Sequence, residues 1–499
     1  MIVAQLMSVV SSLNVQTVVL FVVVLLLTIA WIRHRQRPQN LPPGPLAWPV
    51  IGNAGELLRG RQLHHVLDGW ARQYGSVVKV WLGPRLTIVL SSFEVVKEAL
   101  IKQADCFSDR MVQAESKHTR GSIVMSNGDN WKERRRFGLS AMRTLGMGKR
   151  SVEHKITEEA RHLLECFDGE GEKPFDPEHA ILNAVSNIIC LISFGYRFEY
   201  TDPKFAYLIK SVKTTLVAAS FANFGLFSFF RRTATDTRDR IESVKTFIQE
   251  VVKDHQESFD ANDIRDIIDM YMVEIEQQEK SGKDVAEDSA FCKTTMWKGI
   301  YDLFVAGTDT TTNTLMWLML YIAMNQDVQE KVQKEIDDVI GGDRQPTIED
   351  RANMPYTNAV LWEILRIRPV TPFGVPHRTH YETEFLGYTI PANTMVFVNH
   401  WTIFHDPKSW KDPEKFDPTR FLSKDGKTVE KPEVFMPFSL GRRVCMGETL
   451  AKMELFLFFV NLLQRFTYSL PANKPRPSLE GIVGVTLGPT PFEVVAKRR

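Results

Sequence analysis

A single cysteine directly ahead of a long apolar stretch constrains this chain more than any other feature. Cys445 stands in the segment Phe438-Ser-Leu-Gly-Arg-Arg-Val-Cys-Met-Gly447, and a helix is predicted for Glu448–Arg465. A cysteine just before a helix faces free backbone N–H groups and the positive end of the helix dipole, and both stabilise a thiolate. The glycines on either side of it let the backbone approach a large flat group, and Arg443 supplies a cation beside that group.

The remaining cysteines offer this thiolate no partner. The five cysteines are scattered, odd in number and never in a Cys-x-x-Cys pair: Cys106, Cys166, Cys190, Cys292 and Cys445. This pattern disfavours a disulfide framework and a zinc ribbon. A lone thiolate suits a haem iron held axially, whereas a buried structural cysteine is the alternative that these residues leave open.

Composition narrows the function classes. The 499 residues carry 61 Lys and Arg against 60 Asp and Glu, a balance that excludes a typical nucleic-acid-binding protein. With 44% apolar and 24% charged residues, the chain is not largely disordered. We expect a mainly helical single domain over residues 46–499 with a small β portion. Its clearest elements are a hairpin at 76–91, a long helix from near Thr294, a helix at 327–340 and short β segments at 373–404.

The N-terminus predicts a membrane anchor. Residues 15–32 are almost continuously apolar, no charged side chain precedes them, and Arg33, Arg35 and Arg37 follow. A cleaved signal peptide would have its basic residues first. By the positive-inside rule, we expect an uncleaved signal anchor within residues 1–32, with the remainder in the cytosol. Residues 33–45, basic and then proline-rich, are expected to form a stiff hinge.

Five motifs along the chain resemble those of the cytochrome P450 superfamily. The segment around Cys445 matches its haem-binding signature Phe-x-x-Gly-x-Arg-x-Cys-x-Gly at every position. The other four are Trp131-Lys-Glu-Arg-Arg135, Ala306-Gly-Thr-Asp-Thr-Thr311, Glu363-Ile-Leu-Arg366 and Pro418-Thr-Arg-Phe421. The N-terminus is similar to that of microsomal members, and residues 369–390 resemble the animal family-2 branch.

The resemblance implies a cytochrome P450 fold and a set of site residues. Cys445 would be the axial ligand of haem b, with Trp131, Arg135, His377 and Arg443 on the cofactor. Asp309 and Thr310 would form the acid–alcohol pair that delivers protons for dioxygen activation. Glu363, Arg366 and Arg420 would form a buried structural triad. The implied substrate pocket holds Phe304, Ala306, Val370, Phe373 and Val485. In such a protein Lys132, Arg134 and Arg136 would face outward, as a solvated face or as a docking patch.

The acid–alcohol segment is also unusual as helix sequence. Gly307 is a poor helix former and the threonine hydroxyls compete for backbone carbonyls, so we expect one helical turn to loosen and open a small polar niche. A Thr-rich face packed in the core is the alternative. For the aromatic residues 221–230, three interpretations stay open: a substrate roof, a loop that dips into the membrane, or core packing.

The implied activity is that of a haem-thiolate monooxygenase acting on a lipophilic xenobiotic, fatty acid or steroid. Electrons would come from NADPH through a separate reductase flavoprotein, with cytochrome b5 as a further partner. The expected location is the endoplasmic reticulum membrane, facing the cytosol. Two alternatives are a haem-thiolate isomerase or dehydratase that uses no dioxygen, and a haem-binding protein without turnover. The Asp309–Thr310 pair speaks against both.

Overall fold

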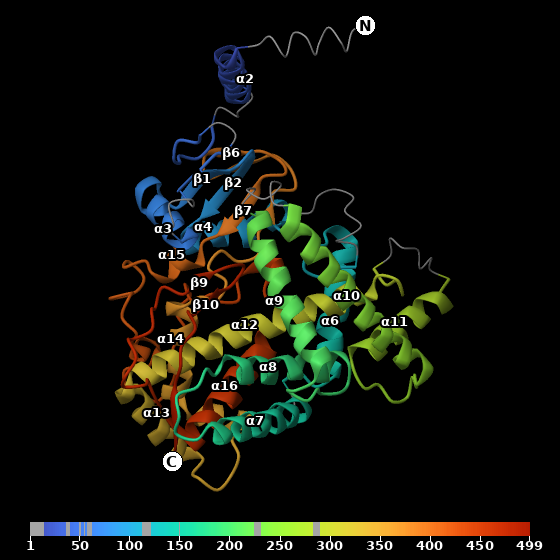
Figure 1. Ribbon diagram of the computed structural model, residues 1–499, viewed down its shortest axis with the longest axis vertical. Coiled ribbons are helices and arrows are strands. Elements are labelled where there is room, and N and C mark those ends of the chain that lie inside the picture. Colours follow the sequence, from blue (N-terminus) through green and yellow to red (C-terminus); the bar gives the residue numbers. More distant parts are fainter. Residues whose placement is uncertain are drawn as a thin grey trace.

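A computed structural model describes residues 14–35, 40–48, 51–53, 55–56, 62–111, 121–148, 150–223, 231–282 and 290–499. Most of these residues are helical (Figure 1). The longer helices are α2 (Val15–Arg35), α3 (Leu63–Tyr74), α6 (Gly128–Thr144), α7 (Arg150–Glu170), α8 (Glu178–Ser193), α9 (Pro203–Asn223), α10 (Arg231–Glu257), α11 (Ile267–Lys280), α12 (Met296–Met324), α13 (Gln326–Val339), α14 (Pro355–Ile367) and α16 (Glu448–Arg465). Short helical segments are α4 (Phe93–Lys97), η2 (Glu98–Lys102), α5 (Ala104–Phe107), η3 (Ile348–Asn353), α15 (His400–Phe404), η4 (Pro418–Phe421) and η5 (Gly441–Arg443).

The strands form one larger sheet and three small ones. The larger sheet has the order β1 (Val77–Leu82), β2 (Arg85–Leu90), β7 (Met395–Val398), β4 (His377–Arg378) and β3 (Asp109–Arg110), in which only β2 and β7 pair in parallel. The two-stranded sheets pair β5 (Thr383–Phe385) with β6 (Tyr388–Ile390), β9 (Ile482–Val483) with β10 (Leu487–Gly488), and β8 (Phe466–Ser469) with β11 (Val495–Arg498). The predicted hairpin is confirmed, and so are the predicted β segments as far as Val398; the last five residues of the predicted range form the helix α15 (His400–Phe404) instead.

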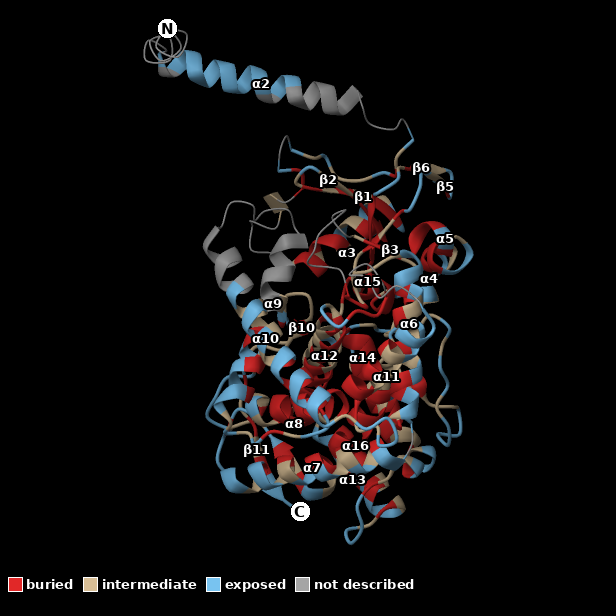
Figure 2. Ribbon diagram, turned by 90° about the vertical axis from the view of Figure 1, so that its right-hand side faces the viewer, coloured by how far each residue is buried: buried red, intermediate tan, exposed pale blue. Residues whose placement is uncertain are grey.

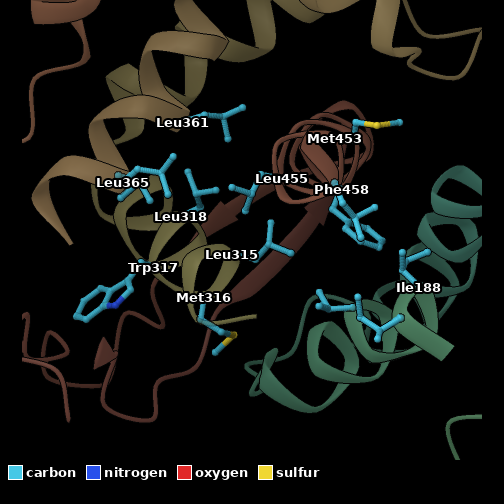
Figure 3. Close-up of a cluster of buried hydrophobic side chains, with 14 of the residues drawn as sticks. Ile188, Leu315, Met316, Trp317, Leu318, Leu361, Leu365, Met453, Leu455 and Phe458 are labelled. Carbon is cyan, nitrogen blue, oxygen red and sulfur yellow. The ribbon is translucent and has the colours of Figure 1, made fainter. Parts of the chain in front are cut away.

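The core lies where α12, α14, α16 and α8 meet. Figure 3 shows Leu315 and Leu318 of α12 facing Leu455 and Phe458 of α16, with α14 above and Ile188 on α8 to one side. These side chains are all but inaccessible to solvent, so the hydrophobic effect fixes the helices against one another. The helix at Glu448–Arg465 has the predicted bounds, and those at 296 and 326 begin within two residues of prediction. The mainly helical class with a small β portion is confirmed.

The helix α2 stands apart from the rest of the molecule (Figure 2). Its described apolar side chains are exposed, among them Leu20 at 63% and Phe21 at 67%. Among the described residues, no helix is long and apolar enough to cross a membrane. The anchor therefore stays a prediction. Arg37 and most of residues 221–230 lie outside the described residues, as do the side chains of Arg33, Arg35 and residues 221–223.

Candidate active site

Cys445 lies in the turn between η5 and α16, as expected for a cysteine just ahead of a helix. Its backbone N–H donates to the carbonyl of Phe438 at 3.1 Å, which closes the turn. The N–H groups of Gly447 and Glu448 bond toward its sulfur and favour the thiolate, but burial among protein atoms outweighs them and raises the pKa of the thiol. The side chain is nevertheless accessible. Cys445 is therefore a cysteine that a ligand can reach, although protein atoms surround it.

The two glycines around Cys445 differ in what their backbones approach. Gly441 adopts φ +74°, and a Cβ there would lie 2.2 Å from the carbonyl oxygen of Leu100. The close approach that requires Gly441 is thus to the chain's own η2 segment, which shapes the turn from behind. At Gly447 an added Cβ would meet only the Cys445 sulfur, at 4.0 Å, an ordinary contact. The expectation that both glycines serve a flat ligand is corrected for Gly441.

Arg443 and Trp131 stack directly beside this turn. The Arg443 guanidinium carbon lies 3.6 Å from the Trp131 ring centroid, a cation–π contact. Arg443 also donates to the carbonyls of Ser108 at 2.9 Å and Ser126 at 2.8 Å, so its planar group is held in one orientation. Arg135, one helical turn after Trp131 on α6, donates to the carbonyl of Val444 at 2.6 Å. Three of the predicted cofactor residues therefore surround the turn that carries Cys445.

His377 and Arg110 complete the cluster from the sheet. They are register partners on β4 and β3, and both are buried. His377 shares a hydrogen bond with the Phe107 carbonyl at 2.8 Å, and burial together with nearby Arg110 holds its pKa well below the ordinary value. Its neighbour Arg378 pairs with Asp109 at 2.7 Å. Sequence reasoning missed Arg110. A lone arginine in a two-residue strand has no sequence signal of its own.

The donors of this cluster fit an anionic group with two carboxylates. Burial and then repulsion from neighbouring arginines, Arg135 in both cases, lower the pKa values of Arg110 and Arg443 to about 9. Arg110 Nε and Arg443 Nη1 are buried without any hydrogen-bond partner. Buried unpaired donors on cations are costly, and a ligand that supplies negative oxygen atoms removes that cost. Haem has two propionates, so the residues present fit it.

The acid–alcohol segment lies on α12, which continues without a break from Met296 to Met324. The expected loosened turn is therefore wrong for the backbone. Thr310 Oγ1 donates to the Ala306 carbonyl at 2.7 Å, and the backbone stays helical although this side-chain hydrogen bond is present. A Cβ at Gly307 would lie 2.4 Å from Ile189 of α8, so Gly307 allows two helices to pack closely. Thr310 is half-buried and Ala306 is exposed although both lie at the middle of α12.

Asp309 is tied to a distant part of the chain. Its Oδ2 accepts a hydrogen bond from Thr486 Oγ1 at 2.5 Å, and Asn313 Nδ2 approaches the same oxygen at 3.2 Å. Burial raises the pKa of Asp309 above the ordinary value, although the bond from Thr486 acts in the opposite direction. Thr486 is a second residue that sequence reasoning missed, because no motif marks it.

The predicted triad is assembled and enclosed. Arg366 donates to Glu363 through Nε at 2.7 Å and Nη2 at 2.9 Å, and both side chains are 0% exposed. Arg420 joins from η4 with Nε 3.1 Å from the same carboxylate. Arg366 Nη1 also donates to the Phe404 carbonyl at 2.7 Å. The arrangement ties α14 to η4 and α15.

Two further predictions need correction. Arg134 does not face outward: it is 3% exposed and its Nε donates to the Ala290 carbonyl at 2.8 Å, while Lys132 and Arg136 are exposed as expected. Phe304 is 1% exposed and packs against Phe194, so its ring belongs to the core rather than to an open wall.

The other predicted pocket residues are spread over three elements. Phe373 is buried in a second apolar cluster with Phe397. Val370 and Val485 are half-buried, and the Val370 carbonyl accepts a hydrogen bond from Leu487 at 2.8 Å, which brings the segment after α14 against the β9–β10 hairpin.

Comparisons with known proteins agree with this geometry. The family model "Cytochrome P450" matches residues 42–496. The chain is 40% identical to Cytochrome P450 2U1 of Mus musculus, over 94% of this chain and 92% of that protein. It is 38% identical to Cytochrome P450 2J2 of Homo sapiens over 96% of both chains, and 39% identical to Cytochrome P450 2H2 of Gallus gallus over 97% and 98%. With its cysteine turn, its cationic cluster and its helical fold, the chain belongs to the cytochrome P450 family, is similar to the animal family-2 members, and is a monooxygenase.

Proposed function

We propose that the protein is a membrane-associated monooxygenase that oxygenates a lipophilic organic substrate, and that the Cys445 thiolate would bind the iron of haem b. Such a thiolate-bound haem activates dioxygen with electrons that come ultimately from NADPH. The observation that carries the proposal is the cluster of unpaired cationic donors beside an accessible Cys445 sulfur. A structural cysteine would not need that cluster.

The chain's own residues divide the remaining work. Arg110, Arg135 and Arg443, with neutral His377, would hold the propionates, while the N–H groups ahead of α16 stabilise the thiolate. On α12, Thr310 would hold the water that passes protons on, and Asp309 would relay them from solvent. The exposed Ala306 would border the space for substrate. This acid–alcohol pair favours a monooxygenase over the isomerase and the non-catalytic alternatives.

The ligand assignment can be tested with cysteine variants. Cys445→Ala should abolish the red-shifted Soret band of the reduced carbon-monoxide complex, because no other thiolate reaches the site. Cys292→Ala, at a buried cysteine whose sulfur contacts Thr294, is the matched control and should keep the band. A band that survives in Cys445→Ala would overturn the assignment.

A basic groove on α6 supports a separate reductase as the electron donor. The groove, about 690 Å³, is lined by Trp131, Lys132, Arg135, Arg136, Leu139, Ser140, Arg143 and Arg442. It contains five cations and no carboxylate, and Arg135 reaches from it to the carbonyl next to Cys445. An acidic flavoprotein surface would be steered to such a groove, and cytochrome b5 is a second candidate for it.

Reversing two exposed charges tests this docking surface. Lys132→Glu with Arg136→Glu should slow reduction by the NADPH-dependent reductase by roughly tenfold at low salt, since steering depends on charge. The difference from the unmodified protein should shrink as salt rises. Lys334→Glu, on the exposed surface of α13, is the control. If the charge-reversed variant and the unmodified protein are reduced at equal rates at every salt concentration, the reductase docks elsewhere.

For the location, we propose the cytosolic face of the endoplasmic reticulum membrane. The exposed apolar residues of α2, followed by arginines in the sequence, support it. Deletion of residues 1–38 should release the protein from carbonate-washed microsomes with its haem intact. Retention of the shortened protein would show that α2 is not the anchor.

A further inference from the structure

The β9–β10 hairpin lies in direct contact with the middle of α12. Trp317 Nε1 donates to the Leu487 carbonyl at 3.0 Å, so the hairpin backbone is bonded to a core side chain of the helix. A Cβ at Gly488 would lie 2.5 Å from Asn313 Oδ1, so a larger residue there would have to displace the Asn313 side chain. Because the contacts are this close, a displacement of the hairpin must move side chains of α12.

Thr486, at the turn of this hairpin, holds the acid of the acid–alcohol pair. Its hydroxyl donates to Asp309 Oδ2 at 2.5 Å, and Asn313 Nδ2 lies 3.2 Å from that oxygen and 3.4 Å from the Thr486 hydroxyl. Both contacts use Oδ2. No described residue donates a hydrogen bond to Oδ1, which leaves that oxygen to meet water.

The Thr486 hydroxyl also affects the charge state of Asp309. Burial raises the pKa of this carboxyl, and the bonds from Thr486 and Asn313 oppose the shift because they favour the ionised form. Two charged groups act on it from neighbouring helices: Lys213 of α9 lowers the pKa and Glu178 of α8 raises it, and these two form an ion pair with each other. Thr486 and Asn313 are the two neutral donors among these groups, and only Thr486 lies outside α12, on the β9–β10 hairpin.

We infer that Thr486 is a positioning residue for proton delivery: it fixes the Asp309 carboxyl through Oδ2 and so makes the conformation of the β9–β10 hairpin part of the proton path. The inference rests on the proposed role of Asp309 and deepens it. The hairpin also carries Val485, which is half-buried. A substrate that displaces the hairpin therefore also displaces the Asp309 carboxyl, through Thr486. The shape of the substrate thereby affects the share of NADPH electrons that is used to form product rather than hydrogen peroxide.

The contact in which Thr486 holds the Asp309 carboxyl, called the clamp below, is tested first by a measurement that needs no turnover. The infrared carbonyl band of protonated Asp309, identified in the holoprotein by its loss in Asp309→Asn, is followed as a function of pH. Thr486→Val keeps the side-chain shape and removes the donor, so the band should persist to higher pH. Thr486→Ser retains the hydroxyl and should titrate like the unmodified protein. An unchanged titration in Thr486→Val would overturn the clamp.

The second measurement is the share of NADPH electrons that appears as hydrogen peroxide. Thr486→Val should raise this share by about three- to tenfold, less than the loss of a general acid itself, and Thr486→Ser should restore it. Thr490→Val, at a half-buried threonine on the same segment whose hydroxyl donates to the Ser478 carbonyl, is the control. If Thr486→Val shifts the infrared band but Asp309→Asn leaves the peroxide share normal, proton relay through Asp309 fails while the clamp holds. If Asp309→Asn raises the share and Thr486→Val does not, the positioning role is overturned.

Discussion

Two groups of arginine-containing charges in this protein differ in how completely their side chains are paired. Glu363, Arg366 and Arg420 form a closed set: each donor of Arg366 finds an oxygen, and the carboxylate accepts from both arginines. Among the described residues, none of these three side chains has a buried atom without a partner. The triad is complete without any ligand.

The second group, Arg110, Arg135 and Arg443, is open. It gathers three cations beside Cys445, and two of its N–H-bearing nitrogens are buried without a partner. Asp109, whose charge acts on Arg443, is already shared by Arg378 and His380. A closed set of charges stabilises the fold, whereas an open set is complete only when an anion binds. This difference separates a structural ion pair from a binding site where burial alone does not.

The largest effect should follow from breaking the closed set. Glu363→Ala leaves Arg366 buried without its counter-charge, and the free energy of unfolding should fall by about 3–5 kcal/mol. Glu349→Ala removes an exposed partner of Arg150 and should cost less than about 1 kcal/mol. Denaturant unfolding followed by circular dichroism measures both. If the two variants are equally stable, the triad is not structural.

A solitary buried acid sharpens the comparison. Glu454 on α16 is 1% exposed and has no cationic partner among the described residues. Burial raises its pKa to about 8, although a hydrogen bond from Thr311 acts in the opposite direction. Its folded-state pKa lies above the unfolded value, so the native state keeps a proton that the unfolded state releases. Between about pH 4.5 and 8 the free energy of unfolding should therefore fall as pH rises, by at most about 1.4 kcal/mol for each pH unit.

Glu454→Gln should remove this slope. The variant and the unmodified protein are unfolded in denaturant at several pH values from 4.5 to 8, and the difference between their free energies is plotted against pH. Glu448→Gln, at the start of the same helix and paired with Lys452, serves as the control and should leave the slope in place. Parallel curves for Glu454→Gln would show that Glu454 ionises normally.

The smallest of the three effects concerns the open set. Arg443→Leu removes a charged donor from the ligand and should speed transfer of haem to an acceptor protein by roughly 10- to 100-fold, the range for one charged hydrogen bond. Arg442→Leu, its exposed neighbour paired with Asp105, is the matched control and should transfer haem at the normal rate. Equal rates of haem transfer from the two variants would show that Arg443 does not bind the haem.

The sequence alone was sufficient to predict those structural features that depend on residues close together in the chain. The helix after Cys445 and the i, i+3 spacing of Glu363 and Arg366 follow from helix geometry alone, and the structure has both. The hairpin at β1 and β2 is equally local, since a turn fixes its register. Family motifs added Trp131, which the structure places against Arg443.

Which side of a helix becomes buried could not be derived from α6 alone. Its run of basic residues predicts an outward face, but Arg134 lies inward because the Ala290 carbonyl, contributed by a segment 156 residues away, accepts its hydrogen bond. In the same way, Gly307 was expected to weaken the helix, whereas in the structure its missing side chain leaves space for Ile189 of α8. Both outcomes depend on the neighbouring element, which helix propensity does not include.

The sequence by itself therefore determined the family, the mainly helical class, the cysteine turn and the residues that local spacing brings together. Only the tertiary structure placed Arg110 beside Arg443 and Thr486 beside Asp309. Thr486 and Asp309 are 177 residues apart and belong to no common motif. A hydrogen bond between distant residues forms only where the packing of whole elements brings the two residues together. Burial then sets how costly it is for a charged group there to have no partner.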